Sequence, residues 1–335
     1  MKYIQAIRNL FNRQAIVLMY HRITDTDTDP WQLAVSPRNF EEQLQVLQKK
    51  YRVIAVSELV QQLYCKDIKE KCVCLTFDDG YSDNYVAAKP LLEKYATPTS
   101  FFIPSEYIDK NNPFWWDELE DLILKSSTLP AILSLSIGGE NLLFHLNSEA
   151  LTDFQVQQQQ SWVWPAPPPT DRCSLYLHLW ERLKPLAYPE IQLVLKNLKE
   201  WAGYIAPANK NNIPMTGVQL KTLAAHPLFT IGLHTVTHPA LAFHSYEVQS
   251  KEIAGNREWM VAFINKRAEA LAYPYGNFND TTVAVLKEQG ILAGFTTESK
   301  LISKNDSPYR LGRFQVNNWD GETFERQLYN WTKGA

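Results

Sequence analysis

Charge of one sign, paired cysteines and long hydrophobic runs are all scarce in this sequence, and each absence argues against a class of protein. The 335 residues carry 33 Lys and Arg against 36 Asp and Glu, a formal net charge of −3. No long run of one sign occurs, which argues against the basic surface of a nucleic-acid-binding protein. The four cysteines show neither CxxC nor zinc-finger spacing: Cys65, Cys72, Cys74 and Cys173. We therefore expect thiols in a reducing compartment and a core that needs no disulfides.

No stretch of the chain approaches the roughly 18 consecutive apolar residues of a membrane span. The opening sequence, MKYIQAIRNLFNRQAIVLMYH, has no long apolar core and no small-residue cleavage site, so it does not match a secretory signal. We predict a cytoplasmic protein with an N-terminal helix over residues 1–13. This basic helix would either pack on the domain, which we favour, or touch a membrane surface.

Short β-rich apolar runs alternate with helix-length amphipathic segments, a rhythm typical of an α/β layer or barrel. The apolar runs predict strands at 16–21, 73–77, 99–103, 229–233, 270–273, 293–297 and 309–314. Capping signals predict a helix after Ser36, with Pro37 at its first position, and a short helix after Ser57. Further helices are expected near 245–266 and 279–289. Periodicity alone leaves a barrel and an open sheet as alternatives.

The middle of the chain departs from this rhythm. From about 113 to 215 it contains helical segments, a Gln tract at 157–160 and a Pro-rich stretch at 165–169. We interpret this region as a largely helical insertion in a catalytic domain that spans residues 14–335.

The first candidate site residues are two adjacent carboxylates after the strand at 73–77, in the sequence LTFDDGY. Asp78 and Asp79 point in different directions at a strand end, and Gly80 permits a tight turn. One carboxylate can therefore bind a cation while the other faces a reacting water. The alternative is a polar turn that only ends a strand.

A second group, GLHTVTHP, follows the strand at 229–233 and contains His234 and His238. Two histidines four residues apart can reach one metal ion if the segment makes a helical turn. Pro239 keeps that turn short, which suits ligands carried on a loop. Such a pair is, by itself, more often structural.

The third group, LAYPYG, follows the strand at 270–273. Pro274 and Gly276 turn the chain and expose the backbone N–H of Tyr275 as a candidate oxyanion donor, although an ordinary loop has the same residues. Together the three groups predict one Asp and two His as metal ligands, with an open position for water. The other Asp would be the general base of an amide or ester hydrolase.

The order TFDDG, HTxxH and YPYG, with LMYHRI before it and WWDELE after the third strand, resembles the polysaccharide deacetylase family. This family is also called the NodB-homology domain or carbohydrate esterase family 4, and the similarity covers roughly 14–110 and 215–320. It implies a deformed (β/α) barrel, a glycan substrate with N-acetylglucosamine-type amides, and one metal ion, usually zinc. The resemblance assigns Asp78 as general base, Asp79, His234 and His238 as metal ligands, and the Tyr275 amide as oxyanion donor.

Two positions depart from the family's pattern. Ala272 stands where the third motif usually has an arginine that tethers the base, and we predict Arg313, or with less support Arg310, as the replacement. The segment after Arg310 contains no histidine, although the family often uses a late histidine as general acid. We predict His21 as the substitute, because a barrel would direct the end of its first strand to the same mouth. The alternative for His21 is a buried, hydrogen-bonded strand-end residue.

Other residues receive weaker predictions. Trp115 and Trp116 either line a sugar subsite or, as we favour, pack in the core. Asp117 and Glu118 are expected in the first turn of a helix, where the helix dipole favours negative charge. Three further histidines receive no catalytic role: His145 and His178 in the insertion, and His244, which is expected at the surface.

The sequence therefore predicts a metal-dependent hydrolase that removes N-acetyl or O-acyl groups from amino-sugar-containing glycans, with a divalent cation, zinc by preference, as cofactor. His and carboxylate ligands also accept cobalt, nickel, manganese or iron. The adjacent pair in FDDG differs from the DxD spacing of phosphoryl-transfer enzymes and from the separated carboxylates of glycoside hydrolases. A glycan-binding protein that has lost catalysis stays an alternative, since the usual tether and late histidine are missing.

Overall fold

The computed structural model describes residues 13–68, 71–204 and 212–333. The chain divides into two compact units. Unit 1 comprises Met1–Asp25, Leu33–Asp109 and Met215–Ala335, and unit 2 comprises Thr26–Gln32 and Lys110–Pro214. The helix predicted at 1–13 lies outside the described residues apart from Arg13. Among the residues described, no helix has the length and apolar character needed to cross a membrane.

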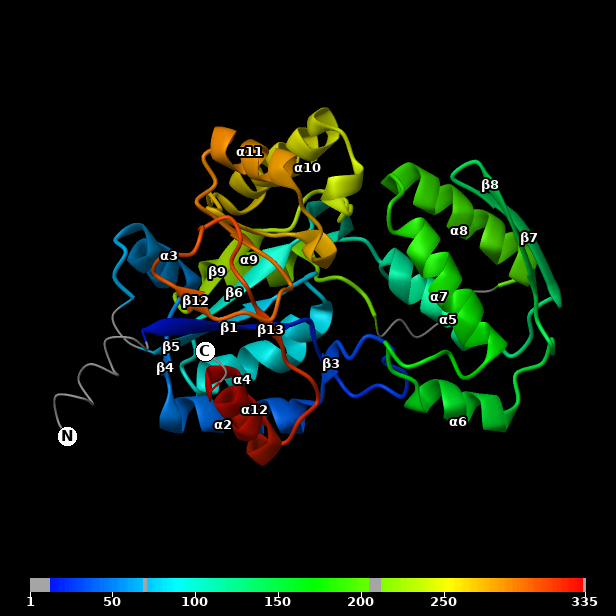
Figure 1. Ribbon diagram of the computed structural model, residues 1–335, viewed down its shortest axis with the longest axis horizontal. Coiled ribbons are helices and arrows are strands. Elements are labelled where there is room, and N and C mark those ends of the chain that lie inside the picture. The colour runs from blue at the N-terminus through cyan, green and yellow to red at the C-terminus, as the bar shows by residue number, and fades with distance from the viewer. Residues whose placement is uncertain (1–12, 69–70, 205–211, 334–335) are drawn as a thin grey trace. The chain divides into compact units, whose positions relative to one another are not determined.

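Unit 1 is built on a nine-stranded sheet whose path runs β11-β10-β9-β6-β5-β1-β12, with β4 beside β5 and β13 beside β1 (Figure 1). The strands are β1 (Gln14–Tyr20), β4 (Arg52–Val53), β5 (Cys72–Phe77), β6 (Thr99–Ile103), β9 (Phe229–Leu233), β10 (Ala270–Ala272), β11 (Ala293–Phe295), β12 (Ile302–Ser303) and β13 (Phe314–Gln315). All described pairings in this sheet are parallel except that of β1 with β12. A short ladder also joins β2 (Arg22–Ile23) to β3 (Ala34–Val35).

The late segment around β13 brings the two sides of the sheet together. Leu311 forms a parallel bridge with Phe295 of β11, and Phe314 pairs with Leu18 of β1. The sheet is therefore curled into a (β/α) barrel, as predicted. The barrel is deformed because its closing segment, predicted as a strand over 309–314, pairs regularly only at β13 and otherwise touches β11 through a single bridge.

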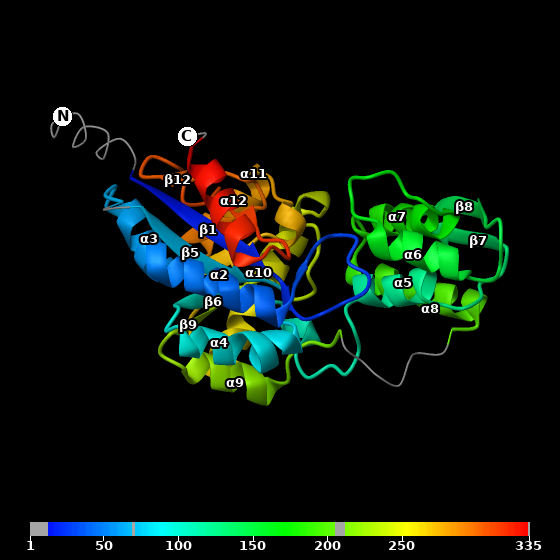
Figure 2. The ribbon, with the colours of Figure 1, turned by 90° about the horizontal axis from the view of Figure 1, so that it is seen from below.

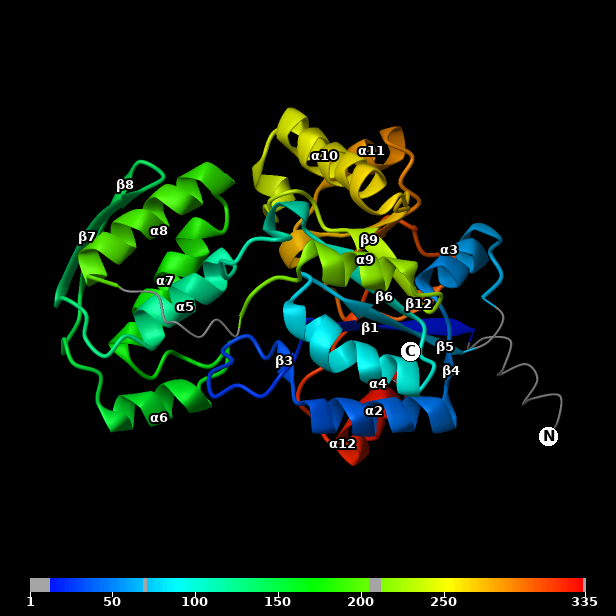
Figure 3. The same ribbon diagram turned by 180° about the vertical axis from the view of Figure 1, so that it is seen from behind.

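Helices cover the outer face of the curled sheet. They are α2 (Pro37–Lys50), α4 (Lys89–Lys94), α9 (Gly217–Ala225), α10 (Tyr246–Ile264), α11 (Asp280–Glu288) and α12 (Gly321–Lys333). The unit also contains helix α3 (Val56–Tyr64), on the other face, and the short helical turns η1 (Asn84–Ala88), η2 (Ser105–Tyr107), η3 (Leu241–Phe243) and η4 (Pro274–Gly276). Figures 2 and 3 show α2, α4 and α9 along the outer side of β1, β5, β6 and β9. Phe40 of α2 and Leu220 of α9 pack there in one cluster with Phe77 and Phe101 of the sheet.

Helix α3 packs against the inner face of the barrel, at the amino ends of the strands. Ala15 and Cys72, at the starts of β1 and β5, cluster with Leu59 and Leu63 of α3. The Tyr64 hydroxyl also donates to a main-chain carbonyl just before β11. Because α3 occupies this end, the carboxyl ends of the strands form the edge that is left for a site.

Two predicted helix starts have different outcomes. Ser36 caps α2 as predicted, since its side chain accepts from the Asn39 N–H and Pro37 is the first helical residue. The cap predicted at Ser57 is wrong, because α3 already begins at Val56 and Ala55 precedes it without a side-chain cap. Val56 is 4% exposed, so its burial in the core rather than a capping hydrogen bond sets the start of this helix.

Unit 2 contains four helices and one hairpin among its described residues: α5 (Trp115–Leu124), β7 (Ile132–Ile137), β8 (Glu140–His145), α6 (Asp153–Ser161), α7 (Asp171–Leu183) and α8 (Tyr188–Ala202). Arg172 of α7 is fully buried, and its guanidinium donates to the carbonyls of Ser126 at 2.5 Å and Glu149 at 2.8 Å. These two hydrogen bonds link α7 to the chain segments before and after the hairpin β7–β8.

The antiparallel hairpin β7–β8 was not predicted, since the sequence analysis expected mainly helices in this region. Its signal is nevertheless present in the sequence ILSLSIGGENLLFH. Leu133 and Ile137 are buried while Ile132 is 54% exposed, a period-two pattern that a strand requires. Gly138 and Gly139 then turn the chain at φ 59° and 84°, a conformation that glycine adopts without strain.

Candidate active site

The register of the parallel strands brings the predicted motifs to one edge of the barrel. Tyr20 of β1 lies beside Phe77 of β5, so His21 and Asp78 follow neighbouring strand ends. Leu233 of β9 lies beside Leu271 of β10, so the segments that begin at His234 and Tyr273 follow a second pair of neighbouring strand ends, on the other side of β6. Carboxyl ends of parallel strands are where ligands bind in such folds.

Three side chains converge on one point at this edge. Asp79 Oδ1 lies 3.3 Å from His234 Nε2 and 3.2 Å from His238 Nε2, and the two Nε2 atoms lie 3.1 Å apart. Bonds of about 2.0–2.2 Å from one zinc-like ion to three such atoms place the atoms about 3–3.5 Å from one another. The three residues, each at most 5% exposed, therefore fit a single cation and could hold a metal ion.

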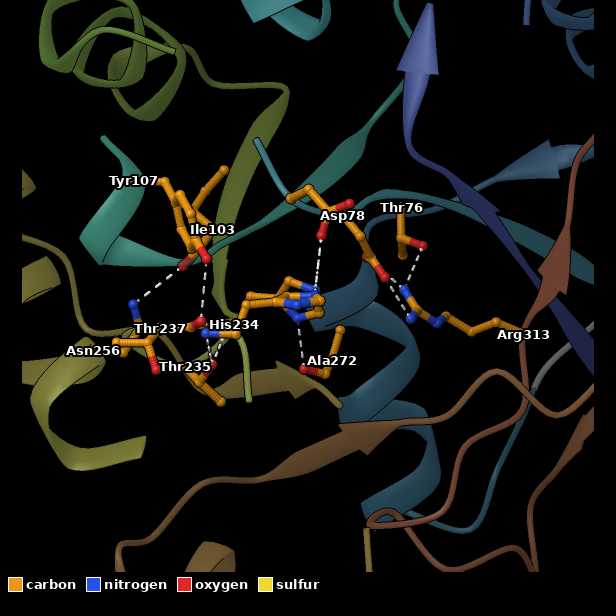
Figure 4. Close-up of polar contacts among 12 residues, drawn as sticks. Thr76, Asp78, Ile103, Tyr107, His234, Thr235, Thr237, Asn256, Ala272 and Arg313 are labelled. Carbon is orange, nitrogen blue, oxygen red and sulfur yellow. Dashed lines mark hydrogen bonds and ion pairs between the residues drawn. The ribbon is translucent and has the colours of Figure 1, made fainter. Parts of the chain in front are cut away.

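His234 is oriented by the main chain of β10. Its Nδ1 lies 2.8 Å from the carbonyl oxygen of Ala272 (Figure 4). Because a carbonyl only accepts, Nδ1 carries the hydrogen, and the lone pair of Nε2 points toward Asp79 and His238. The side chain of residue 272 takes no part in this contact, so the orientation of His234 does not depend on the residue type at position 272.

The two histidines lie on an irregular turn rather than on a helix. Thr235 and His238 both have left-handed backbones, at φ 67° and 61°. The Thr235 hydroxyl donates to the His234 carbonyl at 2.5 Å and accepts from the His238 N–H at 3.0 Å. This turn brings residues four apart together, although the sequence analysis required a helical turn for that.

Asp78 is held by a buried arginine. Arg313, which is fully buried, donates from its two terminal nitrogens to Asp78 Oδ1 and Oδ2, both at 2.7 Å (Figure 4). Its guanidinium also donates to Thr76 Oγ1 at 3.2 Å and to the Thr296 carbonyl at 3.0 Å. Arg310, the alternative in the sequence analysis, is 53% exposed along its side chain and pairs with Asp280, so it does not contact Asp78.

The electrostatics favour the ionised form of both aspartates. Burial alone raises the pKa of Asp78, but the charge and hydrogen bonds of Arg313, together with smaller effects of His234 and His21, outweigh it and leave the pKa below its usual value. Burial also raises the pKa of Asp79, and the close contacts with His234 and His238 more than reverse this effect. Burial lowers the pKa of His238, which favours the neutral imidazole that metal binding requires.

The turn after β10 lies against the metal-ligand group. Tyr275 adopts φ 57° and packs edge-on against His238, with ring centroids 4.6 Å apart at 75°. At Gly276, with φ 65°, an added Cβ would meet Thr297 Oγ1 at 2.1 Å, so only glycine fits. The YPYG sequence therefore produces a tight turn whose tyrosine touches a candidate ligand.

His21 follows β1 directly beside Asp78. The Asp78 N–H donates to the carbonyl of Tyr20 at 3.0 Å, and Asn84 donates to the carbonyl of His21 at 2.8 Å. The ring Nδ1 of His21 is buried and has no hydrogen-bond partner among the described residues. His21 therefore lies beside Asp78, where the prediction places it. The alternative was a buried ring held by hydrogen bonds, and Nδ1 makes none among the described residues.

The structure gives the remaining candidates other surroundings. Trp115 and Trp116 are 2% and 7% exposed within unit 2, and Trp116 stacks on Phe114 at 4.8 Å. Core packing, the favoured interpretation, accounts for them. Asp117 and Glu118 lie in the first turn of α5 as expected. His145 and His178 lie in unit 2, and His244 is half-buried rather than at the surface.

Sequence reasoning missed the residues that hold the candidate groups in place. Thr76 and Thr296 contact Arg313, and Glu252 and Asn256 of α10 contact the turn that carries the two histidines. No motif marks them. The one available signal is that Glu252 and Asn256 are four residues apart and therefore share a helix face.

Comparisons with known proteins give a consistent result. The family model for polysaccharide deacetylase matches residues 66–126 and 189–294. The chain is 22% identical over 302 residues to the putative polysaccharide deacetylase YxkH of Bacillus subtilis, covering 90% of this chain and 70% of that protein. It is 34% identical over 87 residues to the poly-beta-1,6-N-acetyl-D-glucosamine N-deacetylase of Staphylococcus epidermidis, covering 26% of this chain and 29% of that protein. The structure of IcaB from Ammonifex degensii has a similar fold, with a TM-score of 0.60 at 18% identity over 96% of this chain and 97% of that one.

Replacing one candidate ligand tests the metal group directly. We expect the protein to bind one divalent cation per chain, and His238→Ala to weaken binding by more than about 100-fold, since a direct ligand contributes more than the outer contacts for which 10–100-fold is typical. Metal content after dialysis, measured by mass spectrometry, checks this. His145→Ala, in unit 2, is the matched control, and equal metal content in both variants would refute the assignment.

Proposed function

We propose that this chain, which belongs to the polysaccharide deacetylase family, is a metal-dependent hydrolase that removes N-acetyl or O-acyl groups from amino-sugar-containing glycans. One observation carries the proposal. Asp79, His234 and His238 present three ligand atoms to one point, beside an ionised Asp78 that is held by Arg313. The similarity to an N-deacetylase of an N-acetylglucosamine polymer supports the choice of substrate class.

We propose zinc as the cation, because two imidazoles and one carboxylate, with an open position for water, are the ligands that catalytic zinc prefers. The cation, when bound, would acidify a water and polarise the carbonyl of the acetamide. Burial of all three ligands strengthens the electrostatic interactions at this point.

In this proposal Asp78 is the general base that takes a proton from the attacking water. A base must be ionised and correctly aimed, and Arg313 supplies both conditions. Its charge stabilises the carboxylate, and its two hydrogen bonds fix the plane of the carboxyl group. Arg313 thereby takes the role of the family's tethering arginine, whose usual position is occupied by Ala272 in this chain.

Two further roles complete the proposed reaction. The amide of Tyr275, on the turn that touches His238, would donate to the oxyanion that forms when water attacks the carbonyl. His21, beside Asp78 at the neighbouring strand end, would give a proton to the leaving amine. Both roles follow from placement at the same edge of the barrel.

A glycan-binding protein without catalysis is the weaker candidate. The missing tether and the missing late histidine are the two arguments for it, and the contact between Arg313 and Asp78 weakens the first. A protein that only binds glycans has no need for a buried base aligned by a buried arginine.

Acetate release decides between the two functions. Metal-loaded protein should release acetate from N-acetylglucosamine oligomers, and Asp78→Asn should lower kcat by about 10²–10⁴ while retaining the cation, since it removes only the base. Metal-free protein should be inactive and should recover on adding zinc. Release of acetate at equal rates by Asp78→Asn would exclude Asp78 as the base, and metal binding without acetate release from any substrate in the panel would favour the glycan-binding alternative.

Arg313→Ala should reduce kcat by at least about 100-fold, because the base loses its partner and its orientation. The variant should also be less stable, by about 3–5 kcal/mol, since Asp78 becomes an unpaired buried charge. Kinetics and urea unfolding measure the two effects separately. Arg310→Ala, three residues away and exposed, is the control, and a kcat for Arg313→Ala that matches this control would rule out the tether.

His21→Asn should lower kcat by about 10²–10⁴ with little change in KM, since a proton donor acts in the transition state rather than in binding. The effect should shrink for an activated ester, such as an aryl acetate, whose leaving group needs no proton. Equal losses on amide and aryl ester would show that His21 has a structural role instead.

A further inference from the structure

The turn at residues 234–238 carries both histidine ligands in a conformation that the backbone does not favour. Thr235 and His238 are non-glycine residues with positive φ, and such conformations persist only where surrounding contacts impose them. In this conformation of the turn the two Nε2 atoms converge to 3.1 Å. Whatever holds the turn therefore also holds the ligand geometry.

The carboxylate of Glu252, on α10, accepts three hydrogen bonds from the middle of the turn. Its Oε2 accepts from the N–H of Val236 at 2.9 Å and of Thr237 at 2.8 Å, and its Oε1 accepts from the Thr237 hydroxyl at 2.7 Å. Three hydrogen bonds to two successive residues fix the direction of both peptide planes. Hydrogen bonds to an ionised acceptor are the stronger kind.

Asn256, one helical turn further along α10, holds the start of the same turn. Its Oδ1 accepts from the His234 N–H at 3.1 Å, and its Nδ2 donates to the Ile103 carbonyl at 3.1 Å, as Figure 4 shows. Asn256 is fully buried. It therefore ties the first histidine ligand to the carboxyl end of β6.

The opposite side of the turn is held mostly by the main chain of η2, and the Tyr107 hydroxyl also donates to the Thr237 carbonyl at 3.4 Å. The N–H groups of Ser105 and Glu106 in η2 donate to the carbonyls of Thr235 at 3.2 Å and Val236 at 2.9 Å. Such contacts persist whatever side chains stand at those positions. The side chains that select this conformation therefore come mainly from α10, and substitution can test them.

We infer that Glu252, assisted by Asn256, is a positioning residue that sets the affinity of the Asp79–His234–His238 group for its cation. This inference rests on the proposed function, in which that group binds metal. A preorganised ligand set binds more tightly because the ordering cost is met in folding rather than in binding. Outer contacts of this kind typically contribute 10–100-fold to metal affinity.

Two substitutions of Glu252 can separate the effect of its hydrogen bonds on metal affinity from the effect of its charge. In Glu252→Gln, the amide oxygen can occupy the Oε2 position and keep both backbone N–H groups, while the amide nitrogen donates to the Thr237 hydroxyl. All three contacts survive without the negative charge. In Glu252→Ala all three are lost.

The experiment compares cation dissociation constants of the full-length chain, measured by competition with a chromophoric chelator, for zinc and for cobalt. We expect Glu252→Ala to weaken binding by about 10–100-fold and Glu252→Gln to stay within about threefold of wild type. The cobalt absorption spectrum should change in Glu252→Ala, because the ligands no longer converge in the same geometry. Glu258→Ala, an exposed glutamate on the same helix, is the matched control and should match wild type.

Unchanged affinity and an unchanged cobalt spectrum in folded Glu252→Ala would overturn the inference. Equal weakening in Glu252→Ala and Glu252→Gln would overturn positioning by hydrogen bonds and point to charge. If Glu252→Ala does not fold, Thr237→Val replaces it, since this removes one of the three contacts and should weaken binding several-fold, and unchanged affinity there has the same meaning. Acetate release is measured separately, so tight metal binding without turnover would contradict the proposed function while leaving the positioning role intact.

Discussion

The ion pair between Asp78 and Arg313 is the interaction on which the arrangement of this edge depends. It joins the end of β5 to the late segment that closes the barrel, through two hydrogen bonds of 2.7 Å. Burying an ionised carboxylate and guanidinium costs several kcal/mol each unless their partners are well placed. Thr76 and the carbonyl of Thr296 accept two further hydrogen bonds from Arg313. Each nitrogen of the guanidinium thus has an acceptor, and the pair aligns the closing segment with the sheet.

A second constraint acts on the metal group, which depends on backbone conformation more than on side-chain packing. His234 and His238 converge because the turn between them adopts two left-handed residues. Side chains of α10 and main-chain N–H groups of η2 hold the turn on opposite sides. The carbonyl of Ala272 orients the ring of His234. The candidate base and the candidate ligands are therefore fixed by separate sets of contacts.

Much of the fold could be predicted because its signals are local. Apolar runs of strand length marked β1, β5, β6, β9, β10 and β11, a capping residue marked α2, and helix-length segments between strands marked α10 and α11. The errors occurred where packing competes with a local signal. Helix α3 begins at Val56 rather than after Ser57 because the core buries Val56. The hairpin β7–β8 was missed although its alternation and its Gly138–Gly139 turn were visible.

The sequence by itself identified the candidate site residues, because Asp78, Asp79, His234 and His238 stand in short motifs directly after strands. It also indicated that a replacement for the missing arginine was needed and named two candidates. Only the tertiary structure separated Arg313 from Arg310, because the deciding contact joins residues 235 positions apart. The same holds for Glu252, whose partners lie in a different element. Motifs record the groups that react, whereas the contacts that aim them arise from chain segments brought together by folding.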